Sequence, residues 1–308
     1  MDIARLRTLR ELAMRQTMAA VAEALRVSPS AVSQQIAQLE AEAGLPLIER
    51  RGRRVRLTQA GQRLVAHADR IIAALEDAKT ELAEMKQTVT GELRVAAFSS
   101  VAAALIPQVM KALEHRHGQL TIVLEEMEPV DSLAALRAWQ ADVALIDDLT
   151  VPAGVPEPNI ERIPILEDQL YAVLPNGHPL AKRSKIAIAD LRGERWAMDT
   201  AFNTYSDVII RACQAAGFDP LVNGKCGGFE VVQPLIEQGC SVAILPGLRV
   251  RERSGRFCIR RLAPEIRRKI FVAFRQGERR HPALAAFLEQ LQKSVKALRI
   301  RTTVRDSG

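Results

Sequence analysis

Residues 27–40 have the sequence VSPSAVSQQIAQLE, and this pattern predicts a capped helix that begins at Pro29. Ser28 can cap the first turn, and a proline suits the first helical position because its missing N–H needs no partner there. The apolar stripe of this helix consists of Val32, Ile36 and Leu39. Their spacing is that of one helix face, so the opposite face is free to contact another molecule.

A shorter helix precedes this one, because Thr17 is suited to cap a segment whose apolar residues also recur at helical spacing. Gly44 and Pro46 provide the stop signals that end the second helix. Two short helices joined by a tight turn predict a helix-turn-helix.

Residues 47–57 (LIERRGRRVRL) predict a β-hairpin, because two strand-like pieces flank a turn at Gly52. The tip is strongly basic and contains Arg50, Arg51, Arg53, Arg54 and Arg56. Guanidinium groups on a hairpin tip can bind DNA phosphates, whereas a solvated charged turn is the alternative.

A long helix is predicted from Thr58 to about residue 88. Its apolar residues follow the alternating four-three spacing of an interhelical seam. They are Leu64, Ala68, Ile71, Leu75, Ala78, Leu82 and Met85. We expect this helix to form a coiled-coil dimer; packing against another domain of the same chain is the alternative.

Beyond Gly91 the sequence alternates short apolar strands with helices, which predicts an α/β fold with a largely parallel sheet. Predicted strands cover residues 92–98, 120–127, 143–146, 170–174, 242–245 and 270–274. An amphipathic helix is expected over residues 282–298, followed by a frayed polar tail at 301–308.

The composition excludes several classes of function. The chain has 308 residues and a formal net charge of +7, which favours polyanionic partners. It contains no apolar run long enough for a membrane span and no signal-peptide pattern, so we expect a cytoplasmic protein without membrane contact. Strong catalytic motifs and closely spaced cysteine pairs are missing, which predicts a protein that is not an enzyme and needs neither metal nor cofactor.

The first 64 residues resemble the DNA-binding domain of LysR-type transcriptional regulators. The resemblance is carried by residues 19–22, 27–36, 39–40, 44–50 and 55–61, and more loosely by 93–95, 141–145, 170–175, 178–180 and 239–246. It implies a winged helix-turn-helix over residues 1–58, a linker helix over 59–90 and an effector-binding domain over 91–300.

By this resemblance the protein is a sequence-specific DNA-binding regulator. Residues at the start of the recognition helix enter the major groove, and a basic wing holds the backbone. The predicted DNA-binding residues are Ser28, Pro29, Ser30, Ser33, Gln34, Gln38, Arg50, Arg51, Arg53 and Arg54. Gln34 can pair with an adenine edge, whereas Ser28 and Ser30 can equally serve as helix caps.

The rear domain resembles the two-lobed fold of periplasmic binding proteins, which implies an effector cleft between lobe I (92–163 with 268–300) and lobe II (164–267). Crossings between the lobes are expected near Pro164 and Lys269. The predicted effector-binding residues are Ser99, Ser100, Thr200, Phe202, Asn203, Thr204, Glu230 and Val231. Helix N-termini in such a cleft favour a small organic anion, although Glu230 would favour an amine.

The resemblance further implies promoter DNA, RNA polymerase, a small-molecule effector and a second copy of the chain as partners, in a homodimer or a homotetramer. Two alternatives stay open. Cys213 or Cys226 can sense oxidant instead of a ligand, or the chain can bind DNA without any effector. The basic stretch from Arg249 to Arg280 is left without an assigned role.

Overall fold

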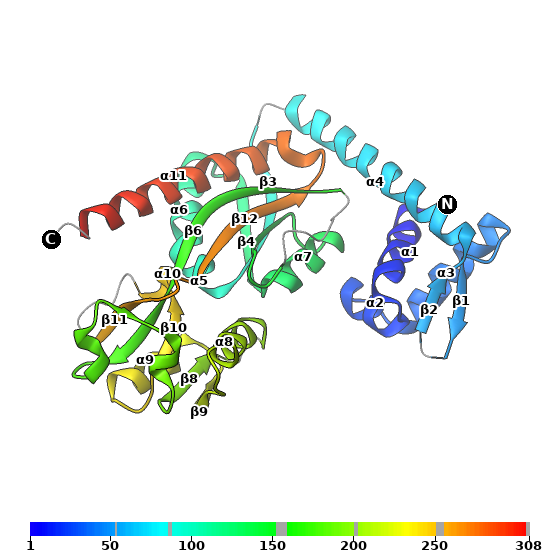
Figure 1. Ribbon diagram of the computed structural model, residues 1–308. Coiled ribbons are helices and arrows are strands. Elements are labelled where there is room, and N and C mark those ends of the chain that lie inside the picture. Colours follow the sequence, from blue (N-terminus) through cyan, green and yellow to red (C-terminus); the bar gives the residue numbers. More distant parts are fainter. Residues whose placement is uncertain (53, 86–87, 152–158, 200–202, 251–255, 306–308) are drawn as a thin grey trace.

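The computed structural model describes residues 1–52, 54–85, 88–151, 159–199, 203–250 and 256–305. Figure 1 shows three parts in chain order: a helical head, a long helix, and a domain of two lobes. Within these ranges, every helix is too short or too polar to cross a membrane.

The head is built from α1 (Ile3–Arg15), α2 (Met18–Leu25) and α3 (Pro29–Ala43). The predicted caps are confirmed: Thr17 accepts from the backbone N–H of Ala20 at 3.2 Å, and Ser28 accepts from that of Ala31 at 3.2 Å. Gly44 ends α3 with φ 66°. The helices enclose a common apolar core that includes Leu9, Leu12, Val21, Ile36 and Leu39. Burial of each such side chain stabilises the head by about 1.5–3 kcal/mol.

The predicted hairpin consists of β1 (Ile48–Arg51) and β2 (Arg54–Leu57), paired antiparallel from Ile48 with Leu57 to Arg51 with Arg54. Val55 donates its N–H to the carbonyl of Gln16 at 2.7 Å, which fixes the hairpin against the end of α1. The first turn of α4 (Gln59–Met85) packs closely behind it. A Cβ at Gly61 would lie 2.1 Å from the carbonyl oxygen of Leu47, so only glycine fits there.

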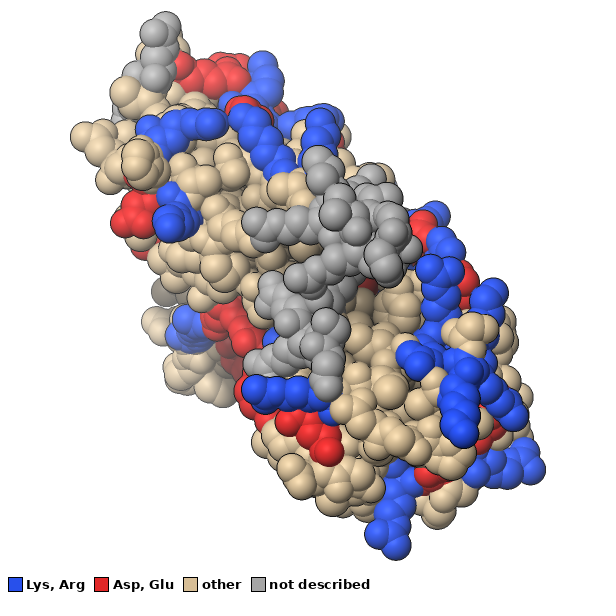
Figure 2. All heavy atoms as spheres, turned by 90° about the vertical axis from the view of Figure 1, so that its left-hand side faces the viewer, with Lys and Arg blue, Asp and Glu red and all other residues tan. Residues whose placement is uncertain are grey.

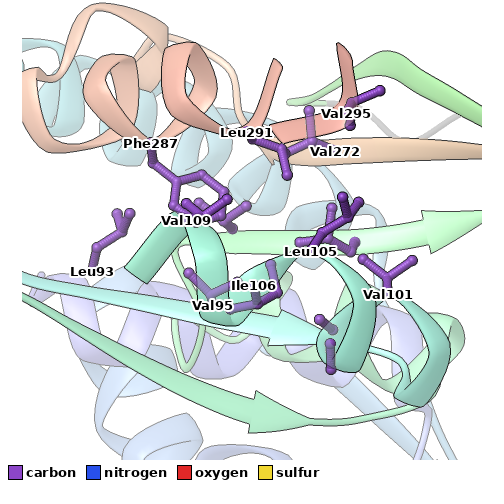
Figure 3. Packing of buried hydrophobic residues seen from close by; sticks show 14 of the residues in the cluster. Leu93, Val95, Val101, Leu105, Ile106, Val109, Val272, Phe287, Leu291 and Val295 are labelled. Atoms are coloured by element: carbon purple, nitrogen blue, oxygen red, sulfur yellow. The ribbon is translucent and has the colours of Figure 1, made fainter. Parts of the chain in front are cut away.

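Lobe I contains the parallel strands β3 (Gly91–Ala97), β4 (Leu120–Glu126) and β5 (Val143–Asp147). Its helices are α5 (Ser99–Ala104), α6 (Ile106–Arg116), α7 (Pro129–Arg137) and α11 (Pro282–Arg305). Figure 3 shows Phe287 and Leu291 of α11 pointing toward the sheet and the helices below, where Val109 and Leu105 lie in the same core.

Lobe II contains β7 (Lys185–Ile186), β8 (Arg195–Asp199), β9 (Leu221–Cys226), β10 (Ala243–Pro246) and β11 (Phe257–Leu262). Its helices are α8 (Asn203–Ala215), α9 (Phe229–Glu237) and the short α10 (Gly247–Val250). A separate core around Trp196 stabilises this lobe, so each lobe has its own apolar interior.

Two long strands serve both lobes: β6 (Ile160–Pro175) and β12 (Arg267–Arg275). They pair antiparallel with each other, and β12 also pairs antiparallel with β5. The prediction of a largely parallel sheet is therefore wrong for the centre of the domain. Sequence periodicity does not give the direction of a strand. Because β6 runs from lobe I to lobe II and β12 runs back from lobe II to lobe I, the two neighbouring strands are antiparallel. Pro164 and Lys269, the expected crossing points, lie within this strand pair.

The last helix also differs from expectation, because α11 continues to Arg305 and includes most of the predicted tail. Residues 283–305 contain neither glycine nor proline, so no residue type there stops a helix.

Candidate DNA-binding surface and interlobe ligand site

The exposed face of α3 presents the residues predicted to contact DNA. Ser28, Pro29, Ser30, Gln34 and Gln38 are exposed, and Ser33 is half-buried. The opposite face is buried in the core of the head, so α3 is held rigidly with this polar side outward. The Oγ atoms of Ser28 and Ser30 lie 2.8 Å apart at the start of the helix. Ser28 is therefore a structural cap, whatever else it contacts.

The hairpin follows α3 in the chain and carries the predicted arginines. Arg54 is exposed on β2, as is Arg56. Arg50 and Arg51 belong to β1, although their side chains are not described, and Arg53 lies outside the described residues. The strand pairing places Arg51 directly opposite Arg54 next to the turn.

The predicted seam on α4 divides into two parts. Leu64 and Ala68 pack in the core of the head, so one copy of the chain already accounts for their burial. Farther along, Ile71, Leu82 and Met85 are 47%, 62% and 79% exposed, Ala78 is exposed and Leu75 is half-buried. The second half of α4 thus presents an apolar stripe that the described residues of this chain leave uncovered.

A pocket lies between the lobes, with an empty volume of about 410 Å³ that includes its opening to solvent. Residues from both lobes and from the crossing strand β12 form its wall. They are Phe98, Ser99, Ser100, Glu128, Pro129, Asp147, Thr150, Asp199, Tyr205, Phe229, Pro246 and Arg268. Several follow the carboxyl ends of strands, which is where α/β folds bind ligands.

The inner wall of the pocket is held by Arg268 of β12, whose side chain is 3% exposed. Its Nη2 donates to Asp168 Oδ2 at 2.9 Å and to Ser100 Oγ at 2.6 Å. Its Nη1 donates to Asp147 Oδ2 at 3.3 Å, and its guanidinium lies 4.9 Å from the ring centre of Phe98. Burial lowers the pKa of Arg268, but the carboxylates of Asp168 and Asp147 outweigh burial and hold it above its ordinary value.

Both carboxylates of this cluster are fully hydrogen-bonded. Asp147 Oδ1 accepts from the backbone N–H of Leu149 at 3.1 Å, and from the N–H and hydroxyl of Thr150 at 2.9 Å each. Asp168 Oδ1 accepts from the N–H of Leu248 at 3.1 Å. The cluster therefore joins β5, β6, β12 and α10 at the place where the lobes meet.

Tyr205 of α8 closes the lobe II side and donates its hydroxyl to the carbonyl of Ile244 at 3.2 Å. Burial raises the pKa of Tyr205 well above its ordinary value. The carboxylates of Asp168, Asp147 and Asp199 raise that pKa further, against the opposing effect of Arg268. Burial is thus the main cause of the raised pKa of this phenol.

A second arginine connects the two lobes. Arg249 of α10 donates to the Oγ of Ser99 in lobe I, and its guanidinium lies 4.6 Å from the ring centre of Phe229 in lobe II. A hydrogen bond on one lobe and a cation–π contact on the other favour a fixed angle between them.

The predicted ligand residues have mixed outcomes. Ser99 and Ser100 line the pocket. Thr200 and Phe202 lie outside the described residues, and Asn203 and Thr204 begin α8 with side chains that are not described. Glu230 and Val231 do not line the pocket: both are exposed on α9, and Phe229 forms the wall instead. A helix turns by about 100° per residue, so an error of one position moves a side chain off the site.

Sequence reasoning missed Asp147, Asp168 and Arg268. Asp147 directly follows the buried run of residues 143–146, so its place at a strand end could have been a signal. Asp168 and Arg268 lie inside β6 and β12, and only the pairing of these two strands brings them together.

Two family models match the chain, one over the head and one over the domain of two lobes. The sequence model described as "Bacterial regulatory helix-turn-helix protein, lysR family" matches residues 3–62, and that of the "LysR substrate binding domain" matches residues 86–296. The chain belongs to the LysR family of transcriptional regulators.

Relatives of this LysR-family regulator match it over most of their length. The regulator OxyR of Escherichia coli is 28% identical over 300 residues, which are 96% of this chain and 95% of OxyR. The dual regulator GltC of Bacillus subtilis is 27% identical over 260 residues, or 84% of this chain and 85% of GltC.

Solved structures share the fold of the LysR-family regulator along the whole chain. A full-length OxyR variant from Pseudomonas aeruginosa has a TM-score of 0.61 at 24% identity, covering 96% of this chain and 97% of its own. CbnR in complex with its target DNA has a TM-score of 0.51 at 25% identity, covering 96% of this chain and all of CbnR.

The cysteines of the LysR-family regulator differ in accessibility. Cys213 and Cys226 are buried in separate apolar clusters, whereas Cys240 is exposed and Cys258 is partly exposed. Burial, assisted by Asp219, raises the pKa of Cys213 to about 11. Burial also raises the pKa of Cys226, with a smaller effect from Asp199. Both thiols are thus protonated near neutral pH, which opposes reaction with an oxidant.

Several described arginines of the basic stretch from Arg249 to Arg280 have acidic partners in the LysR-family regulator, whereas residues 251–255 lie outside the described part. Arg268 is buried as described above, and Arg275 pairs with Glu278 at 2.8 Å and with Asp142 at 3.0 Å. Arg267 and Arg279 pair with acidic residues at the surface. Figure 2 shows Lys and Arg most densely on lobe II, at the lower right, with acidic side chains among them.

Proposed function

We propose that occupancy of the interlobe pocket by a small molecule controls how this regulator is arranged on promoter DNA. The observation that carries the proposal is the wall of the pocket, to which both lobes and the crossing strand β12 contribute. A ligand that contacts both lobes favours one angle between them, and so shifts the population of conformations.

The strand β12 also provides a route from the pocket to the head. Arg268 at its start lies in the pocket, and Arg275 at its end lies 3.9 Å from the ring centre of Trp139. The same ring lies 4.2 Å from the guanidinium of Arg7 in α1. A second contact joins the parts, since Arg26 pairs with Glu125 at 3.1 Å. A shift of β12 can therefore change the contact between effector domain and head.

DNA recognition is assigned to α3 and the hairpin. Ser33, Gln34 and Gln38 would contact base edges, and Arg50, Arg51, Arg53 and Arg54 would contact phosphates. Ser28, Pro29 and Ser30 would approach the backbone beside them. A second copy, joined through the exposed half of α4, would place two such heads on an interrupted palindrome.

The remaining partners follow from this role. We propose that two such dimers form a homotetramer and that the regulator contacts RNA polymerase at the promoter. Because its DNA partner is the chromosome, we place the regulator in the cytoplasm.

The redox alternative is less well supported, since both Cys213 and Cys226 are buried and protonated.

The proposal is tested by a thermal-shift screen of the full-length protein against small metabolites, with each stabilising compound then added to a DNase I footprint of its own promoter. We expect a compound that raises the melting temperature to alter the footprint as well. Stabilising compounds that all leave the footprint unchanged would contradict ligand control while leaving the DNA-binding role intact.

A further inference from the structure

One arginine lies in the turn of the helix-turn-helix itself. Arg26 ends α2 and comes just before Ser28, the cap of α3. Its backbone is in the left-handed region, with φ 53°, and its N–H donates to the carbonyls of Ala22 and Glu23. Its side chain is 68% exposed. The backbone of Arg26 is therefore fixed beside the N-terminal end of the recognition helix, and its guanidinium extends from there to the surface.

Arg26 is also the only lysine or arginine of the sequence between residues 16 and 49. The charged residues of α3 itself are both acids, Glu40 and Glu42. A recognition helix enters a groove that is flanked by phosphates, and lysine and arginine side chains supply most of the attraction to those phosphates. Arg26 was not among the predicted DNA-binding residues, yet its position suits it to a phosphate beside the start of α3.

In the structure, a carboxylate of lobe I occupies this guanidinium. Arg26 Nη2 donates to Glu125 Oε1 at 3.1 Å and lies 3.5 Å from Glu125 Oε2. Gln140, also in lobe I, donates its side-chain amide to the carbonyl of Ala24 near the end of α2. Lobe I therefore holds the turn of the helix-turn-helix by an ion pair and a hydrogen bond.

The edge of lobe I that makes these contacts is unfavourable for DNA. Glu125 and Glu126 end β4, the edge strand of its sheet, and both are exposed. A phosphate that approached Arg26 with Glu125 still in place would meet the negative charge of that carboxylate at short range and be repelled. Full contact between Arg26 and a phosphate therefore requires Arg26 to leave Glu125.

We infer that Arg26 is a DNA-phosphate contact of this regulator and that Glu125 is its intramolecular competitor. In the free protein, Glu125 and Gln140 of lobe I hold the turn. On DNA, a phosphate replaces the carboxylate and the contact with lobe I is released. The effector domain thereby lowers the affinity of its own head for all DNA sequences alike. The inference rests on the proposed function, because it takes the exposed face of α3 as the side that meets DNA.

Fluorescence anisotropy of the full-length protein with labelled duplexes, at several salt concentrations, tests the phosphate contact. Arg26→Gln removes the charge from an exposed side chain and should weaken binding to the promoter and to an unrelated duplex by a similar factor, about threefold. It should also lower the salt slope by about one. Arg26→Lys keeps a positive charge and should restore the slope. An unchanged slope in Arg26→Gln would overturn the phosphate contact.

Two neighbouring acids test the competition. Glu125→Gln frees Arg26 and should tighten binding to both duplexes about threefold at low salt, a modest factor because an exposed ion pair is weak. Glu126→Gln removes the same charge from the next residue of β4, whose side chain lies on the opposite face of the strand, and is the matched control. Equal gains for the two variants would indicate general repulsion of DNA and would overturn the competition.

The double variant shows whether the two residues act on each other. In an Arg26→Gln background, Glu125→Gln should tighten DNA binding no more than Glu126→Gln does, because the guanidinium that the carboxylate occupies is gone. A gain from Glu125→Gln that keeps its full size without Arg26 would overturn the inference. Failure of the inference differs from failure of the proposed function: specific DNA binding with a ligand-dependent footprint, but no coupling between Arg26 and Glu125, overturns only the inference.

Discussion

Arg268 and Asp168 are direct cross-strand partners on β12 and β6, and their side chains meet at 2.9 Å. The pair lies where the two crossing strands pass from one lobe to the other. Because both side chains are almost fully buried, the bond contributes to a fixed relation between the lobes, and Arg268 forms part of the pocket wall.

Removal of this guanidinium should destabilise the effector domain strongly. Arg268→Met leaves Asp147 and Asp168 buried without a counter-charge, which costs about 3–5 kcal/mol. Urea unfolding followed by circular dichroism measures the loss. The control is Arg267→Met, the adjacent residue, whose ion pairs are exposed and should contribute little. Similar losses for both variants would contradict a special role for Arg268.

Two variants in the head should separate base reading from phosphate binding. Gln34→Ala removes one exposed side chain of α3 and should weaken specific binding by about 1–3 kcal/mol. Arg54→Ala should weaken binding to all sequences alike and lower the salt slope by about one. Fluorescence anisotropy at several salt concentrations checks both, with Arg70→Ala on α4 as the control. A sequence-dependent effect of Arg54→Ala would exclude a pure phosphate contact.

The exposed half of α4 should be a dimer contact. Leu82→Lys places a charge in the apolar stripe and should shift the chain toward monomer in analytical ultracentrifugation. The neighbouring Glu81→Lys changes an exposed acid on the same helix and serves as the control. Should Leu82→Lys sediment as the native protein does, the stripe is covered by something other than a second copy.

The thiols should titrate in two classes. Cys240 should react rapidly with Ellman's reagent at pH 8, and Cys213 should stay unreactive until the protein unfolds.

The pKa of Cys213 in the folded state, about 11, lies above its ordinary value, so the folded state holds this proton more tightly than the unfolded state. The free energy of unfolding should therefore fall as pH rises from the ordinary thiol pKa toward 11. Fast oxidation of Cys213 by peroxide in the folded protein would restore the redox alternative.

Trp139 should couple the effector domain to the head. Trp139→Ala removes the ring that Arg7 and Arg275 both contact, so ligand binding should persist while its effect on the DNA footprint diminishes. Val130→Ala, an exposed position on the nearby α7, is the control. A full footprint response in Trp139→Ala would show that the signal takes another route.

The head was predictable from sequence because its signals are local. Thr17, Ser28, Pro29 and Gly44 each act within one turn of a helix, and the structure uses them as predicted. Strand direction and the inner wall of the pocket were not predictable in this way. Arg268 and Asp168 are a hundred residues apart in sequence and meet only through the pairing of β6 with β12.

On the ligand site, the structure differs from the expectation in position along a helix. Glu230 and Val231 are adjacent to Phe229, which does line the pocket, but they face solvent. The small organic anion stays a prediction, since it followed from helix N-termini alone.

The central claim is that the interlobe pocket controls the arrangement on DNA. The most direct test compares DNase I footprints, with and without the stabilising compound, for the native protein and for Phe229→Trp, which fills the pocket from its lobe II wall. We predict that the variant binds promoter DNA as tightly as the native protein but gives one footprint under both conditions. A ligand-dependent footprint that persists in Phe229→Trp, with unchanged ligand affinity, would contradict the account.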